Sequence, residues 1–310
     1  ADPIRFEESN AGAGPRATPT WHEGTLYTLG ATGLLNALVA TSGAPRWTRD
    51  AAQDTGERVP EWAFAGSPLV VGELVVVALS GRLAAYARAS GELAWLGPAG
   101  GASYGSPQLA TLAGMEQILL LAGGSVLGVS PADGATVLWR HEWKAGASIL
   151  QPALTADGEL LLAGVDAMGG IGLRRLGLAR AGASWNVSER WTSRGLKPYF
   201  SDLVQLGGAA FGLDNGILVC LDLAQGERHW KDGRYGHGQL LLLADQALLL
   251  VLTEEGELAL VRADTAEFTE LARLPVLTGK TWNHPVLAGD TLFVRNGGEM
   301  AAYRLATAGP

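Results

Sequence analysis

The stretch GRLAAYARASGELAW, Gly81–Trp95, contains the unit from which this chain is built. It opens with a glycine, continues as a short apolar run, turns at Ser90-Gly91 and ends in a tryptophan. Similar stretches are GLLNALVATSGAPRW (Gly33–Trp47), Val126–Trp139 and GILVCLDLAQGERHW (Gly216–Trp230), at a spacing of roughly forty-four residues. A repeat of this length with short apolar and β-branched runs predicts an array of small antiparallel sheets.

One copy, residues 64–97, divides into four short strands joined by glycine-containing turns. Such a copy is predicted to be a four-stranded meander, which matches one blade of a β-propeller. The chain is therefore predicted to be all-β, one β-propeller domain over residues 1–310. Its seven blades are expected at residues 17–50, 64–97, 104–143, 149–193, 199–232, 237–273 and 282–306.

The seventh copy ends after its third strand, at residues 300–305. An incomplete last blade would leave a sheet edge exposed, so a ring is expected to close. We expect residues 2–8 to supply the missing outer strand, with Phe6 near the tryptophan position, so that N- and C-terminal strands complete one blade. The alternative is an eight-bladed propeller with an incomplete first blade.

Two residue types recur in register with the copies. A proline stands at the start of the first strand, where its missing amide donor is harmless: Pro19, Pro68, Pro107, Pro152 and Pro285. A tryptophan opens the fourth strand: Trp47, Trp95, Trp139, Trp191 and Trp230. A large ring repeated in one register is expected to pack between neighbouring sheets rather than to bind a ligand.

Composition excludes several classes of protein. The 310 residues carry 23 basic and 31 acidic side chains, for a net charge of −8, which disfavours nucleic acid as a partner. No apolar run is long enough for a membrane span. The single cysteine, Cys220, excludes an internal disulfide and is expected to be a buried apolar group. A monomer is expected.

The copies resemble the quinoprotein-type repeat, named after the dehydrogenases that use pyrroloquinoline quinone (PQQ). Its pattern is a glycine, a strand ending Ala-Leu-Asp, and then Ala-x-Thr-Gly-x-x-x-Trp. The best matches are residues 35–47 and 219–230, and the resemblance covers nearly the whole chain. It implies a bacterial PQQ-like propeller. Such repeats occur in quinoprotein dehydrogenases and in outer-membrane assembly lipoproteins, which bind partners without chemistry.

The dehydrogenase class implies a quinone, a hard cation and a disulfide between adjacent cysteines, and this chain has one cysteine. A hard cation needs several converging carboxylates, whereas the aspartates here are scattered singly: Asp54, Asp157, Asp166, Asp202 and Asp214. The five histidines lie at none of the short spacings of a metal motif. We therefore expect no PQQ, no other cofactor, no metal and no catalytic residue.

Polar and aromatic residues gather just before the first strand of each copy, which in a propeller lines the mouth of the central channel. Convergence of such groups predicts a ligand site, whose candidate residues are Arg16, Trp62, Tyr104, Gln151, Lys197, Tyr199, Tyr235, His237, Lys280, Trp282, Asn283 and His284. Alternatively, these groups only solvate the channel and satisfy backbone groups at strand ends. His237 and His284 occupy equivalent positions in adjacent copies and could share a ligand or ion.

The sequence thus favours a non-catalytic scaffold that binds a protein or a small polar ligand at one face, through loops on a rigid frame. The resemblance places such a protein in the bacterial periplasm or cell envelope, after export. One alternative is a quinone- or metal-dependent oxidoreductase. Another is a glycan-binding module in which Trp62, Tyr104 and Trp282 stack against sugars.

Overall fold

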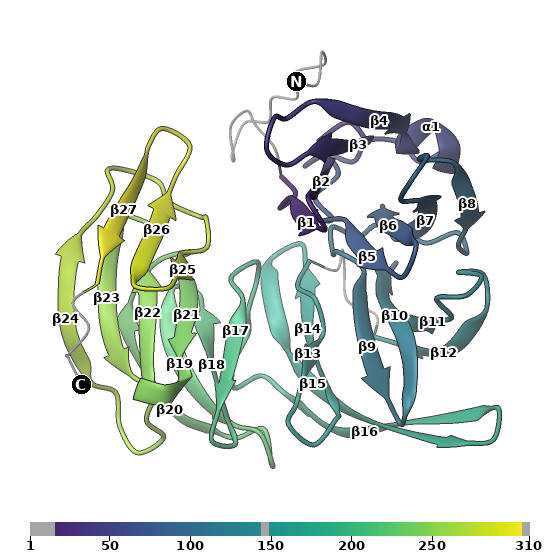
Figure 1. The fold of residues 1–310 in the computed structure, drawn as a ribbon. Coiled ribbons are helices and arrows are strands. Elements are labelled where there is room, and N and C mark those ends of the chain that lie inside the picture. Colours follow the sequence, from purple (N-terminus) through teal and green to yellow (C-terminus); the bar gives the residue numbers. More distant parts are fainter. Residues whose placement is uncertain (1–15, 144–148, 306–310) are drawn as a thin grey trace. The chain divides into compact units, whose positions relative to one another are not determined.

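The computed structural model describes residues 16–143 and 149–305. These residues form seven antiparallel sheets with their connecting segments (Figure 1). In each sheet the strands lie side by side in chain order, as a meander requires. The predicted all-β fold, a seven-bladed β-propeller, is confirmed. The predicted outer strand at residues 2–8 lies outside the described residues.

The first sheet contains β1 (Thr20–His22), β2 (Thr25–Leu29), β3 (Leu34–Val39) and β4 (Pro45–Asp50). The second contains β5 (Leu69–Val71), β6 (Leu74–Leu79), β7 (Arg82–Ala87) and β8 (Leu93–Leu96). The third contains β9 (Gln108–Leu112), β10 (Met115–Ala122), β11 (Ser125–Val129) and β12 (Val137–Glu142). The fourth contains β13 (Ala153–Leu154), β14 (Leu160–Asp166), β15 (Gly169–Ala181) and β16 (Ser184–Ser193).

The fifth sheet contains β17 (Leu203–Leu206), β18 (Ala209–Asp214), β19 (Ile217–Asp222) and β20 (Arg228–Arg234). The sixth contains β21 (Gln239–Leu243), β22 (Leu248–Leu252), β23 (Glu257–Arg262) and β24 (Glu270–Pro275), with the 3-10 turn η1 (Ala244–Gln246) between β21 and β22. The described part of the seventh sheet has three strands, β25 (Val286–Ala288), β26 (Thr291–Arg295) and β27 (Met300–Arg304).

The contacts divide the chain into two compact units. The first unit comprises residues 1–162 with 176–189, and the second comprises residues 163–175 with 190–310. In the first unit the middle strand β6 is apolar on both sides because both sides are covered. Val75, Val77 and Leu79 pack into a core with the first sheet, whereas Val76 and Ala78 pack with the third. The alternating side-chain directions of a strand explain this division.

The tryptophans of the fourth strands join neighbouring sheets, as predicted. The indole Nε1 of Trp47 donates to the Arg88 carbonyl at 2.9 Å, and that of Trp230 donates to the Asp264 carbonyl at 2.9 Å. Trp139 differs, because its indole donates to Gln117 of its own sheet. Each of these bonds satisfies a polar N–H in a mostly covered position.

The sequence pattern did not predict the one α-helix among the described residues, α1 (Ala51–Thr55). Asp50 caps its N-terminus by accepting from the Gln53 N–H at 3.0 Å, and Gly56 ends it in a left-handed conformation. Tyr86 donates its hydroxyl to Asp54 at 3.0 Å. A helix this short has no apolar period to reveal it, and its tertiary contacts stabilise it.

Candidate binding site before the first strands

The residues just before each first strand, here called the approach segments, are partly tied to one another by polar side chains. In the first unit the Thr18 N–H donates to Ser67 Oγ at 2.9 Å, and the Ser67 N–H donates to Ser106 Oγ at 2.8 Å. Gln151 donates its side-chain amide to the Ser106 carbonyl at 3.3 Å. These contacts satisfy backbone groups at strand starts, so Gln151 has a structural role here.

In the second unit one buried side chain makes the equivalent connection. Gln239, which is 3% exposed, stands at the start of β21. Its Nε2 donates to the Trp282 carbonyl at 3.2 Å, and its Oε1 accepts from the Asp202 N–H at 3.3 Å. The approach segments of the fifth, sixth and seventh sheets are therefore held together by one amide.

Four rings from these three segments form what we call the aromatic cluster: Tyr199, Phe200, His237 and Trp282. The ring of Phe200 stacks on His237 at 5.0 Å between centroids and lies 5.0 Å from Trp282. Tyr199 lies 5.1 Å from Phe200 and meets His237 edge-on at 6.5 Å. All four side chains are half-buried. These separations are those of favourable aromatic pairs.

Glu254 supports the cluster from the hairpin between β22 and β23. One carboxylate oxygen accepts from the Trp282 indole at 2.8 Å, and the other accepts from the backbone N–H of His237 at 3.0 Å. Burial raises the pKa of this carboxyl, but the two hydrogen bonds and the nearby His237 and Lys280 outweigh burial and hold the pKa below its ordinary value. The cluster therefore lies against an ionised carboxylate at neutral pH.

Lys280, Asn283 and His284 flank Trp282. The Lys280 ammonium lies 3.8 Å from the centroid of the Trp282 ring, within cation–π range. His284 is exposed as a residue and Asn283 is half-buried. Surrounding protein atoms lower the His284 pKa, and the charge of Asp202 partly opposes this shift. His237 thus lies among rings beside Glu254, whereas Asp202 is the carboxylate that acts on His284.

Lys197 takes part in an ion pair with a buried carboxylate. Asp214, at the end of β18, is 1% exposed, and its two oxygens lie 3.5 Å from Lys197 Nζ and 2.8 Å from Lys231 Nζ. A buried carboxylate needs such partners because its desolvation is costly. Asp214 therefore positions Lys197, which precedes Tyr199 by two residues in the same approach segment.

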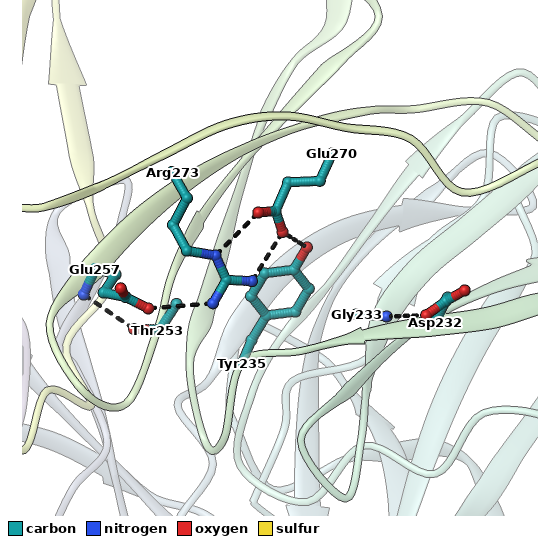
Figure 2. Close-up of polar contacts among 7 residues, drawn as sticks. All are labelled: Asp232, Gly233, Tyr235, Thr253, Glu257, Glu270 and Arg273. Atoms are coloured by element: carbon teal, nitrogen blue, oxygen red, sulfur yellow. Dashed lines mark hydrogen bonds and ion pairs between the residues drawn. The ribbon is translucent and has the colours of Figure 1, made fainter.

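Tyr235 lies in the core, unlike the other candidates of the second unit. Its hydroxyl faces the Glu270 carboxylate (Figure 2). It is 2% exposed, and its hydroxyl donates to Glu270 at 2.7 Å. Arg273 lies 5.0 Å over its ring and donates twice to Glu270, at 2.9 and 2.8 Å. Burial, followed by the bond to Glu270, raises the pKa of the Tyr235 hydroxyl. We therefore leave Tyr235 out of the proposed site.

The first unit places two of its candidates together. The rings of Trp62 and Tyr104 lie 5.5 Å apart in a tilted arrangement. Trp62 is 36% exposed and Tyr104 is half-buried. Arg16 is half-buried ahead of β1.

Phe200 and Glu254 also belong to the site, although the sequence pattern did not predict them. The signal for Glu254 was available in the strand pairing. Gln239 of β21 pairs with Leu252 of β22, so the residues beyond Leu252 must lie beside those that precede Gln239. His237 and Glu254, each two residues outside that pair, are therefore neighbours.

The profile of the family described as outer membrane protein assembly factor BamB matches residues 5–232. The chain belongs to this family. Among the curated proteins none matches it.

Solved structures share the fold. BamB from Moraxella catarrhalis is 12% identical, with a TM-score of 0.54 over 96% of this chain and 99% of that one. The computationally designed Ika8 protein is 10% identical, with a TM-score of 0.54 over 94% and 96%. A chain of a mitotic checkpoint complex is 11% identical, with a TM-score of 0.63 over 94% and 87%. At these identities the likeness concerns the fold.

Among residues 16–143 and 149–305, no three His, Cys, Asp or Glu side chains are placed to hold a metal ion. The single cysteine excludes the adjacent-cysteine disulfide of the quinoproteins. Across that same part of the chain, no helix is both long and apolar enough to cross a membrane.

Proposed function

We propose that this BamB-family propeller is a non-catalytic scaffold of the bacterial cell envelope that binds a protein partner through the approach segments of its second unit. The observation that carries the proposal is the aromatic cluster, in which Tyr199, Phe200, His237 and Trp282 come from three consecutive sheets. Aromatic residues on a rigid frame are the usual anchors of protein interfaces. Family membership supports a role in assembly at the outer membrane.

A scaffold agrees better with these contacts than a glycan-binding module does. A sugar-stacking tryptophan needs an open ring face. The Trp282 side chain is half-buried, and the Phe200 ring lies 5.0 Å from it, so the indole offers no broad open face to a sugar ring. The half-buried rings instead expose only their edges and small parts of their faces, and such surfaces can contact individual side chains of a protein partner.

Site-specific photo-crosslinking in the bacterium that makes this protein tests the proposal. A benzoylphenylalanine is placed at Asn283, beside the cluster, and in a second strain at the exposed Gln246 of η1, which joins the far ends of β21 and β22. We expect one discrete adduct from position 283, in the envelope fraction, and none from position 246.

Trp282→Leu in the crosslinking strain serves as the specificity test. The adduct from position 283 is expected to disappear, because the largest ring of the cluster is lost. No adduct from either position, or equal adducts from both, would rule out a partner at the approach segments.

A further inference from the structure

We propose that the aromatic cluster receives one basic side chain, an arginine or a lysine of the partner, and that Lys280 occupies the Trp282 ring until that side chain displaces it. This inference rests on the proposed function and specifies its chemistry. The first support is direct: the Lys280 ammonium lies 3.8 Å from the Trp282 centroid. A cation within about 6 Å of an indole is attracted to the negative face of the ring.

The second support is the fixed carboxylate behind that ring. The Trp282 indole donates to Glu254 at 2.8 Å, and this bond draws the N–H dipole toward the anion and leaves the ring face more negative. Glu254 also accepts from the His237 N–H, so its carboxylate is held in place by two donors. When Lys280 moves away, the cluster retains this negative charge, which favours replacement by another cation.

The third support is rigidity. Gln239 connects the segments that carry Phe200 and Trp282, with its amide donating to both of their carbonyls, at 3.5 and 3.2 Å. The Thr281 N–H donates to the Glu254 carbonyl at 2.8 Å, next to Trp282. Rings that are already ordered lose little entropy on binding. Lys280, by contrast, is exposed and stands on a long flexible stem.

Charge also disfavours an anionic ligand. A phosphate or carboxylate bound on these rings would lie near the Glu254 carboxylate, which would repel it. It would also compete with Glu254 for the positive charge of Lys280. Asp202, which acts on His284 from the adjoining segment, adds a second negative charge. A guanidinium, which is planar and weakly hydrated, can stack on the rings and pair with Glu254 together.

Fluorescence anisotropy with a labelled glycine-serine peptide that carries a short run of arginines tests the proposal, and the same peptide with citrulline is the neutral control. The arginine peptide is expected to bind and the citrulline peptide is not. Lys280→Met should tighten binding about fivefold, because a competing cation is removed. Trp282→Leu and Glu254→Gln should each weaken it about tenfold.

Arg304→Met is the matched control, since Arg304 is an exposed cation of the same unit and is 83% exposed. It removes the same charge away from the cluster, so its effect is expected to stay within about twofold. Equal shifts from Lys280→Met and Arg304→Met would show only general electrostatics and would overturn the proposal. So would equal binding of the citrulline peptide, or no binding at all.

Phe200→Leu provides a second variant if Trp282→Leu fails to fold, because the Phe200 side chain has no polar group to lose. It should weaken the arginine peptide several-fold, since one wall of the cluster is removed. If the peptide fails while the crosslink from position 283 persists, the basic-side-chain proposal falls and the scaffold stands. If both fail, the proposed function falls too.

Discussion

The side-chain amide of Gln239 donates to the carbonyl of Trp282 across 3.2 Å, from the first strand of the sixth sheet to the segment that leads into the seventh. Since Gln239 is 3% exposed, these groups are largely withdrawn from water. Gln239→Leu keeps the volume and removes the donor and acceptor. We expect the free energy of unfolding to fall by about 1–3 kcal/mol, the cost of leaving such groups unpaired.

Urea unfolding followed by circular dichroism measures this loss. Gln225→Leu, at an exposed turn position, is the control and should change the free energy of unfolding by less than about 0.5 kcal/mol. A Gln239→Leu protein as stable as the control would mean that the amide does not hold the three segments together.

A second prediction isolates the tryptophan packing between sheets. Gly43 and Gly91 occupy the same turn position in the first and second sheets, with φ of +70° and +71°. A Cβ at Gly43 would meet nothing within 4 Å, whereas at Gly91 it would lie 2.6 Å from the Trp47 ring. Both alanine variants suffer the left-handed backbone, at about 1–2 kcal/mol. Gly91→Ala should lose about 1–3 kcal/mol more, because Trp47 must shift.

Thermal unfolding of the two variants and of the parent protein measures the difference between their losses of stability. Equal midpoints would show that Trp47 moves at no cost and that the indole contact is loose. Gly134→Ala provides a parallel test in the third sheet, because its Cβ would overlap the Trp95 ring.

The repeat could be predicted because its signals are local. Each proline named in the sequence analysis, such as Pro68 before β5, stands one residue ahead of a first strand. Each repeated tryptophan, such as Trp47 in β4, lies in a fourth strand. Both residue types mark positions in a sheet for local reasons. Proline suits a strand start because it lacks an amide donor, and tryptophan suits the fourth strand because its large ring packs against the neighbouring sheet.

The site was predicted less well because its members depend on pairing and on side-chain direction. Glu254 reaches His237 only through the register of β21 with β22. Tyr235 stands four residues before β21, just as Trp282 stands four before β25, yet Tyr235 is buried. The left-handed glycines on either side of it, Gly233 and Gly236, bend the chain locally. Composition gives no measure of that bend.

Cys220 offers a test of the core of the second unit. It is fully buried, and burial raises the pKa of its thiol to about 12. The native protein is therefore expected not to react with a disulfide reagent at neutral pH, since the thiolate is the reactive form. In urea, one thiol per chain should react, because the chain has a single cysteine. Rapid reaction of the native protein would contradict the packing of β19.

Glu270 is expected to make the stability of the protein depend on pH under acidic conditions. Hydrogen bonds from Arg273, helped by the Tyr235 hydroxyl, outweigh burial and hold the pKa of Glu270 below its ordinary value of 4.5 (Figure 2). The unfolded chain binds this proton more readily than the folded one. The contribution of Glu270 to stability is therefore complete above pH 4.5 and is lost as the pH falls through the lower, folded-state pKa.

Glu270→Gln removes this dependence. Since the Glu270 side chain is 25% exposed, we expect a loss of about 1 kcal/mol at neutral pH. The difference between the parent protein and the variant should shrink toward zero as the pH is lowered below 4.5, because the parent carboxyl then becomes neutral as well. Urea midpoints at a series of pH values measure it. Glu267→Gln, at an exposed position outside the Arg273 contacts, should leave the acid limb unchanged, and a difference for Glu270→Gln that stays constant with pH would contradict the ion pair.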